Sequence, residues 1–121
     1  MALAQVGLGT VTSVSAGTSE ACYTVGSAKT AYIRSVLIHA LDQSNVTNCT
    51  VHVVPNNGGS YTSGTATSLT QIAALGISTS DTYFLELAYP LTLSNNGDSL
   101  VVNNIGVESL NVTVLGDKEL W

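Results

Sequence analysis

Residues 49–60 read CTVHVVPNNGGS, an alternating strand pattern followed at once by a run that cannot extend it. Cys49, Val51 and Val53 alternate with polar residues, as they do in a strand that buries one face. Pro55 then lacks an N–H donor, and the glycines that follow permit positive φ, so the strand is expected to end there. The run is therefore interpreted as a corner between two strands of a β-protein.

The strand before it, residues 31–41 (AYIRSVLIHAL), is predicted to form an antiparallel hairpin with residues 48–54. Each strand has one mainly apolar row, and a register slip of one residue would move that row to the opposite face. Only one register of the two strands turns both apolar rows toward the same core. The predicted facing pairs are Ala40 with Cys49, Ile38 with Val51, and Val36 with Val53.

The opposite face of this predicted hairpin is partly polar. It carries Ser35, Leu37 and Thr50, and it places His39 and His52 diagonally on adjacent strands. Two imidazoles in that arrangement are able to share a proton or bind a metal. The pattern supplies no third ligand, so no metal site is predicted, and the face is expected to meet water or another subunit.

Short strand patterns separated by turns recur along the rest of the chain, and helix signals are nearly absent. The further predicted extended segments are residues 10–15, 20–26, 82–88, 91–93, 98–105 and 107–115. Residues 65–76 fit either a short helical turn or an irregular strand. The chain is therefore predicted to be all-β: a single antiparallel β-sandwich of jelly-roll-like type over residues 10–121, with an extended N-terminal arm at residues 1–9.

The segment 82–88 (TYFLELA) has a clear two-sided pattern. The predicted sides are Tyr83, Leu85 and Leu87 against Phe84 and Glu86. Pro90 follows and is expected to interrupt the strand, because proline cannot donate to the ladder.

Charged residues make up 9% of the chain, against about 25% in ordinary soluble domains. With three basic residues and a net charge of −5, the surface cannot neutralise many phosphates, so no nucleic-acid or anionic-membrane partner is expected. A surface covered by partner subunits explains the scarcity of charge, since charge is depleted at the centre of interfaces. The alternative is a solvated face made of Ser, Thr and Asn.

Catalytic patterns do not occur in the sequence. The eight carboxylates are scattered, no G-x-S-x-G elbow is present, and no Cys/His cluster has zinc spacing. Enzymes normally need several polar groups that converge in a pocket. The chain is therefore predicted to be a non-enzymatic binding or structural module, without catalytic residues, cofactor or metal.

Cys22 and Cys49 are the two cysteines. The N-terminal stretch lacks the basic region of a signal peptide, so the protein is expected to be made and kept in a cytoplasm. Thiols stay reduced in that compartment, which favours two buried thiols. A disulfide stays open as the alternative if the two strands are neighbours.

Several segments are candidates for contact with partners. The arm is apolar and uncharged, the loop after Pro55 is accessible in the predicted corner, and tryptophan is enriched at interfaces. Trp121 has the alternative of capping the edge of its own sandwich. The candidate interface residues are Leu3, Val6 and Leu8 in the arm, His39 and His52 on the polar face, Asn56, Asn57 and Tyr61 in the loop, and Trp121.

Three motifs lie in order along residues 31–119. They are Val54-Pro55-Asn56-Asn57-Gly58-Gly59, Pro90-Leu91-Thr92-Leu93 followed by Gly97-Asp98, and Gly116-Asp117-Lys118-Glu119. Over this span the chain resembles the small β-sandwich virion proteins of tailed bacteriophages, including cyanophages. The resemblance implies a capsid decoration or cement protein, which binds the assembled shell and ties neighbouring capsomers together, often as a trimer.

The expected partners follow from this resemblance, from the low charge and from the apolar arm. They are further copies of the chain, in a homo-oligomer expected to be a trimer, and the major capsid protein or other virion proteins. The expected location is the virion, assembled in the cytoplasm of the host bacterium. The alternative is a tail, baseplate or fibre-associated structural module of the same virion. A carbohydrate-binding module of jelly-roll type, with Tyr61 as its exposed aromatic residue, is the least favoured reading.

Overall fold

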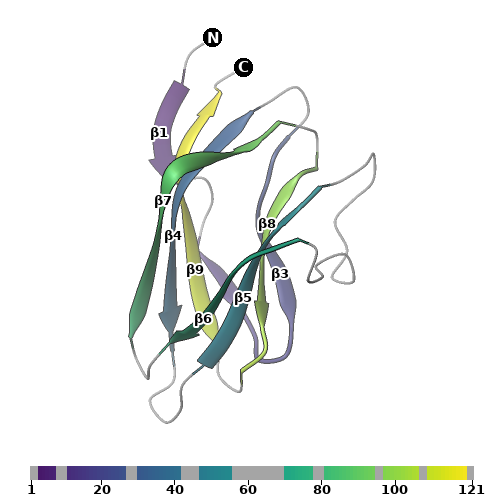
Figure 1. Cartoon of the computed structure of the whole chain (residues 1–121), viewed down its shortest axis with the longest axis vertical. Helices are drawn as coiled ribbons and strands as arrows, with labels where there is room; N and C mark the ends of the chain where they lie inside the picture. The colour runs from purple at the N-terminus through teal and green to yellow at the C-terminus, as the bar shows by residue number, and fades with distance from the viewer. Residues whose placement is uncertain are drawn as a thin grey trace.

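The chain folds into two antiparallel β-sheets packed face to face as a β-sandwich (Figure 1). The computed structural model describes residues 3–7, 11–26, 30–41, 47–55, 70–77, 81–94, 97–106 and 109–119. The strands are β1 (Leu3–Gly7), β2 (Thr12–Val14), β3 (Ser19–Thr24), β4 (Ala31–Ala40), β5 (Thr47–Val54), β6 (Gln71–Ile77), β7 (Thr82–Leu93), β8 (Ser99–Asn104) and β9 (Leu110–Glu119). Within these residues, no helix has the length and apolar character that a membrane crossing requires.

The strand order is that of a jelly roll. Sheet A has the order β1-β9-β4-β7, and β2 pairs with the same edge of β9 beyond β1; sheet B has the order β3-β8-β5-β6. The antiparallel partners are therefore nested: β5 with β6, β4 with β7, β3 with β8, and β1 and β2 with β9. A long hairpin rolled into two layers has this nesting. The predicted all-β, jelly-roll-like sandwich is confirmed.

Residues 3–7 of the predicted N-terminal arm are extended and belong to this fold. They form β1, which pairs antiparallel with β9 of the same chain from Leu3 opposite Glu119 to Gly7 opposite Leu115. The two ends of the described chain therefore lie side by side in sheet A (Figure 1).

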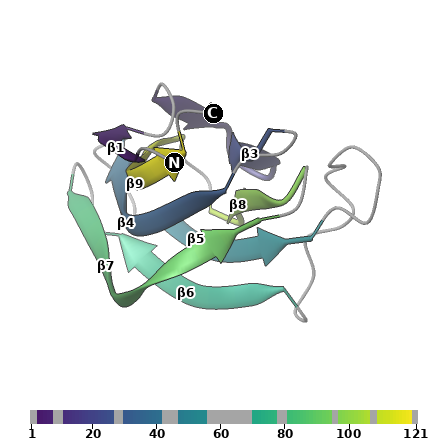
Figure 2. The same cartoon turned by 90° about the horizontal axis from the view of Figure 1, so that it is seen from above.

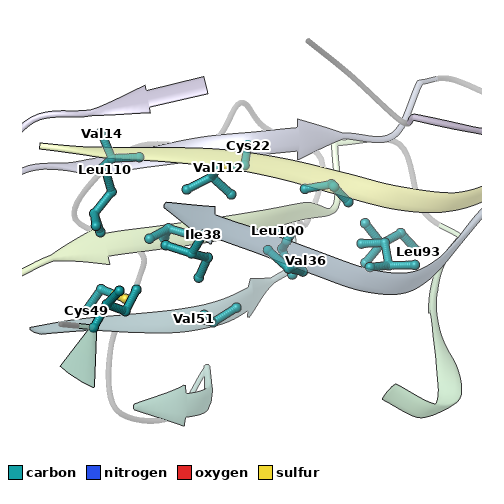
Figure 3. Close-up of a cluster of buried hydrophobic side chains, with 14 of the residues drawn as sticks. Val14, Cys22, Val36, Ile38, Cys49, Val51, Leu93, Leu100, Leu110 and Val112 are labelled. Atoms are coloured by element: carbon teal, nitrogen blue, oxygen red, sulfur yellow. The ribbon is translucent and has the colours of Figure 1, made fainter. Parts of the chain in front are cut away.

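The core lies between the inner faces of the two sheets. Val36 and Ile38 reach it from β4, and Cys49 and Val51 reach it from β5, each at most 1% exposed. Figure 3 shows these side chains meeting in one layer. The apolar rows predicted for the two strands do share a core, because period-two alternation turns each row to one face of its sheet.

The predicted hairpin between β4 and β5 is nevertheless wrong. β4 lies between β7 and β9 in sheet A, where Ile38 pairs with Val112, whereas β5 lies between β6 and β8 in sheet B, where Val51 pairs with Val102. The two rows face each other across the sandwich and are not neighbours in one sheet. The need to bury both rows is satisfied equally well in either arrangement, so the pattern could not choose between them.

β7 continues through Pro90, where an interruption was predicted. Ile33 of β4 pairs with Leu91 and Ser35 pairs with Glu86, so residues 87–90 stand opposite Arg34 alone. Such a bulge bends the strand and leaves proline outside the ladder of hydrogen bonds. Figure 2 shows the sharp bend in β7.

Part of the segment 65–76, which fitted either a short helical turn or an irregular strand, lies in β6. Residues 71–77 form a strand, while residues 65–69 lie outside the described part of the chain.

Gly116 of β9 lies beside the irregular part of β4. A Cβ atom at this position would overlap the carbonyl oxygen of Tyr32 and would lie 3.1 Å from the Arg34 nitrogen. The neighbouring Asp117 accepts a hydrogen bond from Arg34, with 2.6 Å between Oδ2 and Nε. The close approach at Gly116 and the ion pair of Asp117 with Arg34 together hold β9 against β4 at this irregularity.

Buried Asn104, at the end of β8, links the two sheets. Its Nδ2 donates to the Val14 carbonyl oxygen of β2 at 3.1 Å, and its Oδ1 accepts from the Gly106 nitrogen at 3.0 Å. Its own carbonyl oxygen accepts from Gly17, which has a φ of 75° in the turn before β3. Polar pairing of this kind satisfies a side chain that would be costly to bury alone.

Candidate functional site

His39 and His52 lie on different sheets, so the predicted diagonal pair is wrong. His39 is on β4 of sheet A and His52 is on β5 of sheet B. Neither belongs to the core cluster, and each points away from the core on the outer side of its own sheet. The whole sandwich separates the two rings, which therefore cannot share a proton or a metal ion.

His52 is buried, with 3% of its surface exposed. Its Nε2 lies 2.7 Å from the Thr50 hydroxyl and its Nδ1 lies 3.0 Å from the Thr70 hydroxyl. A neutral imidazole has one donor and one acceptor nitrogen, and a hydroxyl is able to serve either. The ring thus connects β5 with the residue that precedes β6, which is a structural arrangement.

His39 is half-buried and has one described hydrogen bond, between Nδ1 and the Thr82 hydroxyl at 2.9 Å. In the register of sheet A it stands between Thr82 of β7 and Asn111 of β9. These three residues form a polar row across the outer face of the sheet.

The next row of this outer face is more apolar. Phe84, Leu37 and Thr113 stand side by side on β7, β4 and β9, and Phe84 is 50% exposed. We call these three residues the Phe84 row. On its other side, Glu86, Ser35 and Leu115 are level with one another. The outer face of sheet A thus presents an apolar centre beside a polar row that contains His39.

The outer face of sheet B is closed around His52, whereas toward β6 Ala74 and Gly76 are exposed. Val101 pairs with His52, lies outside the core cluster, and is fully buried. Ser99, level with Val54, is also fully buried, and its hydroxyl lies 2.9 Å from that of Thr24. The outer face of sheet A differs from this closed patch in that it exposes a large aromatic side chain, Phe84.

The two cysteines are free and buried, as predicted. Burial raises the pKa of the Cys22 thiol to about 12 and that of Cys49 to about 11. A nucleophilic cysteine needs the opposite, an accessible thiol with a lowered pKa. Both side chains fill the core (Figure 3) and offer no reactive group.

Metal-binding residues do not gather in the part of the chain that the structure describes. Among these described residues, no group of three or more His, Cys, Asp or Glu side chains is placed to hold a metal ion. The carboxylate of Asp117 is engaged with Arg34, as described above.

The other candidate interface residues fall in two groups. Leu3 and Val6 are in β1, where their backbones pair with Glu119 and Gly116 of β9. The remaining candidates lie outside the described residues: Leu8, Asn56, Asn57, Tyr61 and Trp121.

Phe84 is not among the interface residues predicted from the sequence. The signal was present, because the alternation in β7 places this large aromatic residue on the same side as Glu86. Leu85 and Leu87, on the opposite side of the strand, pack against the core. An apolar residue on the polar side of a strand is the observation that would have identified this face.

Comparisons of the chain with protein-family models, with curated proteins and with solved structures find no match.

Proposed function

We propose that this chain is a non-enzymatic structural protein of a tailed-bacteriophage virion, a decoration or cement protein. In this role a homo-oligomer of the chain binds the assembled shell and stabilises the contacts between capsomers. The observation that carries the proposal is the half-exposed Phe84, which lies on β7 at the edge of the outer face of sheet A beside the half-buried Leu37.

The composition of this face supports a contact surface. Protein interfaces have an apolar centre that is poor in charge and a polar, solvated margin. The Phe84 row supplies the first, and the row of His39, Thr82 and Asn111 supplies the second. A rigid sheet also presents such a face without first ordering a loop, which lowers the entropic cost of binding.

The polar chemistry of the described residues supports a role without catalysis. His52 has a threonine hydroxyl at each ring nitrogen, and both thiols are buried with raised pKa values. These three groups, which are of the types that serve as base or nucleophile, are therefore engaged or inaccessible.

The motifs behind the resemblance have structural explanations in this fold. Pro90 lies in the bulge of β7, Gly97 has a φ of 90° before β8, and Gly116 permits close approach of β4. Jelly rolls occur in viral capsid proteins and also in lectins, so the virion assignment is an analogy at the level of fold and motif.

The test is co-sedimentation of the purified chain with shells assembled from the major capsid protein of the same genome. We expect saturable binding that Phe84→Asp reduces at least tenfold, because the substitution places a charge in the apolar row. Ile105→Asp is the matched control, since Ile105 is 60% exposed and follows β8 of sheet B. Circular dichroism should show that both variants are folded.

Two outcomes would contradict the proposal. Absence of binding by the unmodified chain, or binding to purified tails in its place, would reject the decoration role and in the second case favour the tail module. Equal binding by both variants would show that the outer face of sheet A is not the attachment surface.

A further inference from the structure

The edges of the sandwich are protected to different degrees. An unpaired edge strand is a template for another chain, and proteins usually blunt it with charge, proline or a bulge. In the described residues, β3 has the exposed Glu20 and a register irregularity between Ala21 and Tyr23. β7 has the exposed Glu86 and the bulge that contains Pro90. The edge formed by β1 and β2 is divided between two short strands.

β6 has the least protection of these edges. Its sequence, QIAALGI, contains no charged residue and no proline, and among the described strands it pairs with β5 alone. A register shift beside Ile72 affects its first two residues, after which Ala73–Ile77 continues regularly along β5. Figure 2 shows β6 at the margin of sheet B.

After the exposed Gln71 at its start, the exposed residues of β6 are apolar or small. Ile72 is 43% exposed, and Ala74 and Gly76 are exposed on the outer side of the regular part. Ala73 and Leu75 pack against the core but are half-buried, because the sheet ends at this strand. A further strand beside β6 would cover Ala73 and Leu75 and pair the backbone groups of the edge.

We propose that β6 is a self-association site, at which a second copy of the chain pairs its own β6 antiparallel across a two-fold axis. Sheet B then continues through both copies. With the pair centred on Leu75, Ala74 stands opposite Gly76 of the second copy, and the two Leu75 side chains extend one core into the other.

A second copy is the occupant that matches β6 by its own sequence, because small residues then face each other across the joint, and the charge distribution permits this contact. Each chain carries a net charge of −5, so most contacts between two copies would bring like charges together. The strand β6 contributes no charge to the joint and therefore permits the approach. The absence of bulky side chains at Ala74 and Gly76 removes steric conflict on the outer side.

This inference does not depend on the proposed function. An isologous contact closes on two copies, whereas the trimer implied by the resemblance needs a contact between unlike surfaces. Measurement of molecular mass therefore separates the two expectations.

The test uses the whole chain with Ala74→Cys and a short bis-maleimide cross-linker. The native thiols are buried, so the added thiol is the reactive one in the folded protein. We expect a covalent dimer as the main product. Ser13→Cys, at an exposed position on β2 of sheet A, is the control and should remain uncross-linked at the same concentration.

A second measurement is sedimentation equilibrium at micromolar concentration. The unmodified chain should have the mass of a dimer, and Ala74→Lys should weaken the association at least tenfold while Ser13→Lys does not. The melting temperature of the two lysine variants, each measured well below its own dissociation constant, reports whether they are folded.

Three results would overturn the inference: a monomer, a trimer in which the Ala74→Cys variant does not cross-link, or cross-linking into species larger than a dimer. A monomer would also remove the homo-oligomer from the proposed function, but none of these results tests the attachment surface, because the Phe84 row and β6 belong to different sheets. Conversely, a dimer that does not bind shells would reject the proposed function and leave the β6 contact intact.

Discussion

The outer faces of the two sheets began from similar sequence patterns and differ in exposure. His39 and His52 each follow a buried apolar residue in an alternating strand, yet His39 is half-buried beside one threonine and His52 is buried between two. Phe84 on sheet A is half-exposed, whereas the smaller Val101 on sheet B is fully buried. A side chain that points away from the core is therefore not always exposed to solvent.

The difference has a functional consequence. A closed outer face adds to the stability of the fold, while an open apolar face costs solubility and is maintained when a partner covers it. The exposed β7 side of sheet A, with Phe84, is therefore the surface that we assign to the binding of shells, and the closed patch around His52 on sheet B is assigned to folding. Three predictions test this division, beginning with the largest effect.

Gly116→Ala should destabilise the protein by about 3 kcal/mol or more, because the new methyl group overlaps backbone atoms that cannot rotate away. The prediction concerns the backbone of sheet A, in which β9 and β4 approach each other closely at Gly116. The control is Gly17→Ala, which meets no atom within 4 Å and should cost about 1 kcal/mol through its φ of 75°. Urea unfolding measures both, and equal costs would show that sheet A is a loosely joined sheet.

His52→Ala should destabilise by about 2–3 kcal/mol, because it leaves the Thr50 and Thr70 hydroxyls without the ring between them. His39→Ala, which removes one exposed hydrogen bond, should cost about 1 kcal/mol or less. The pair of variants compares the two faces directly in one thermal or urea unfolding assay. A larger loss from His39→Ala would reverse the division between the faces.

The buried thiols predict a smaller effect that depends on pH. Burial raises the pKa of Cys22 to about 12 and of Cys49 to about 11, from an ordinary value of 9.0. The unfolded chain thus releases these protons at lower pH than the folded protein does. The stabilisation is complete below pH 9 and is lost as the pH rises toward 11 and 12. At about pH 9.5 the loss should be somewhat under 1 kcal/mol for each thiol.

The control for the thiol prediction is the double variant Cys22→Ala and Cys49→Ala. It should show a shallower fall of unfolding free energy between pH 8 and pH 9.5 in urea titrations. Burial also raises the pKa of Tyr23, and this residue is unchanged in the variant, so the difference in slope isolates the thiols. Identical slopes would mean that the inner face of sheet B is accessible to solvent.

The sequence alone supported a large part of the fold. Alternation identified most of the strands and the inward side of β4, β5 and β9, because a strand that buries one face must repeat every second residue. Recurring strand patterns separated by turns, together with the absence of helix signals, led to an all-β sandwich of jelly-roll type. The buried thiols were predicted on different grounds, from the lack of a signal-peptide pattern and the reducing compartment that this lack implies.

The candidate site was less predictable. Whether His39 and His52 share a surface depends on which strands are neighbours, and that choice rests on contacts between residues far apart in the chain. The path of β7 through Pro90 depends on a bulge opposite Arg34, which no local pattern indicates. Phe84 carried a recognisable signal, but its exposure depends on what packs over sheet A.

The sequence by itself determined which residues of each strand turn toward the core, since the period of two is a local property of extended backbone. Only the tertiary structure decided which strands pair, because the apolar rows of β4 and β5 are buried as well across two layers as within one. The same structure decided that His52 and Val101 on the outer side of sheet B are buried while Phe84 on the outer side of sheet A is half-exposed. The exposure of a side chain depends on how the strands pack together, so the sequence of a single strand does not determine it.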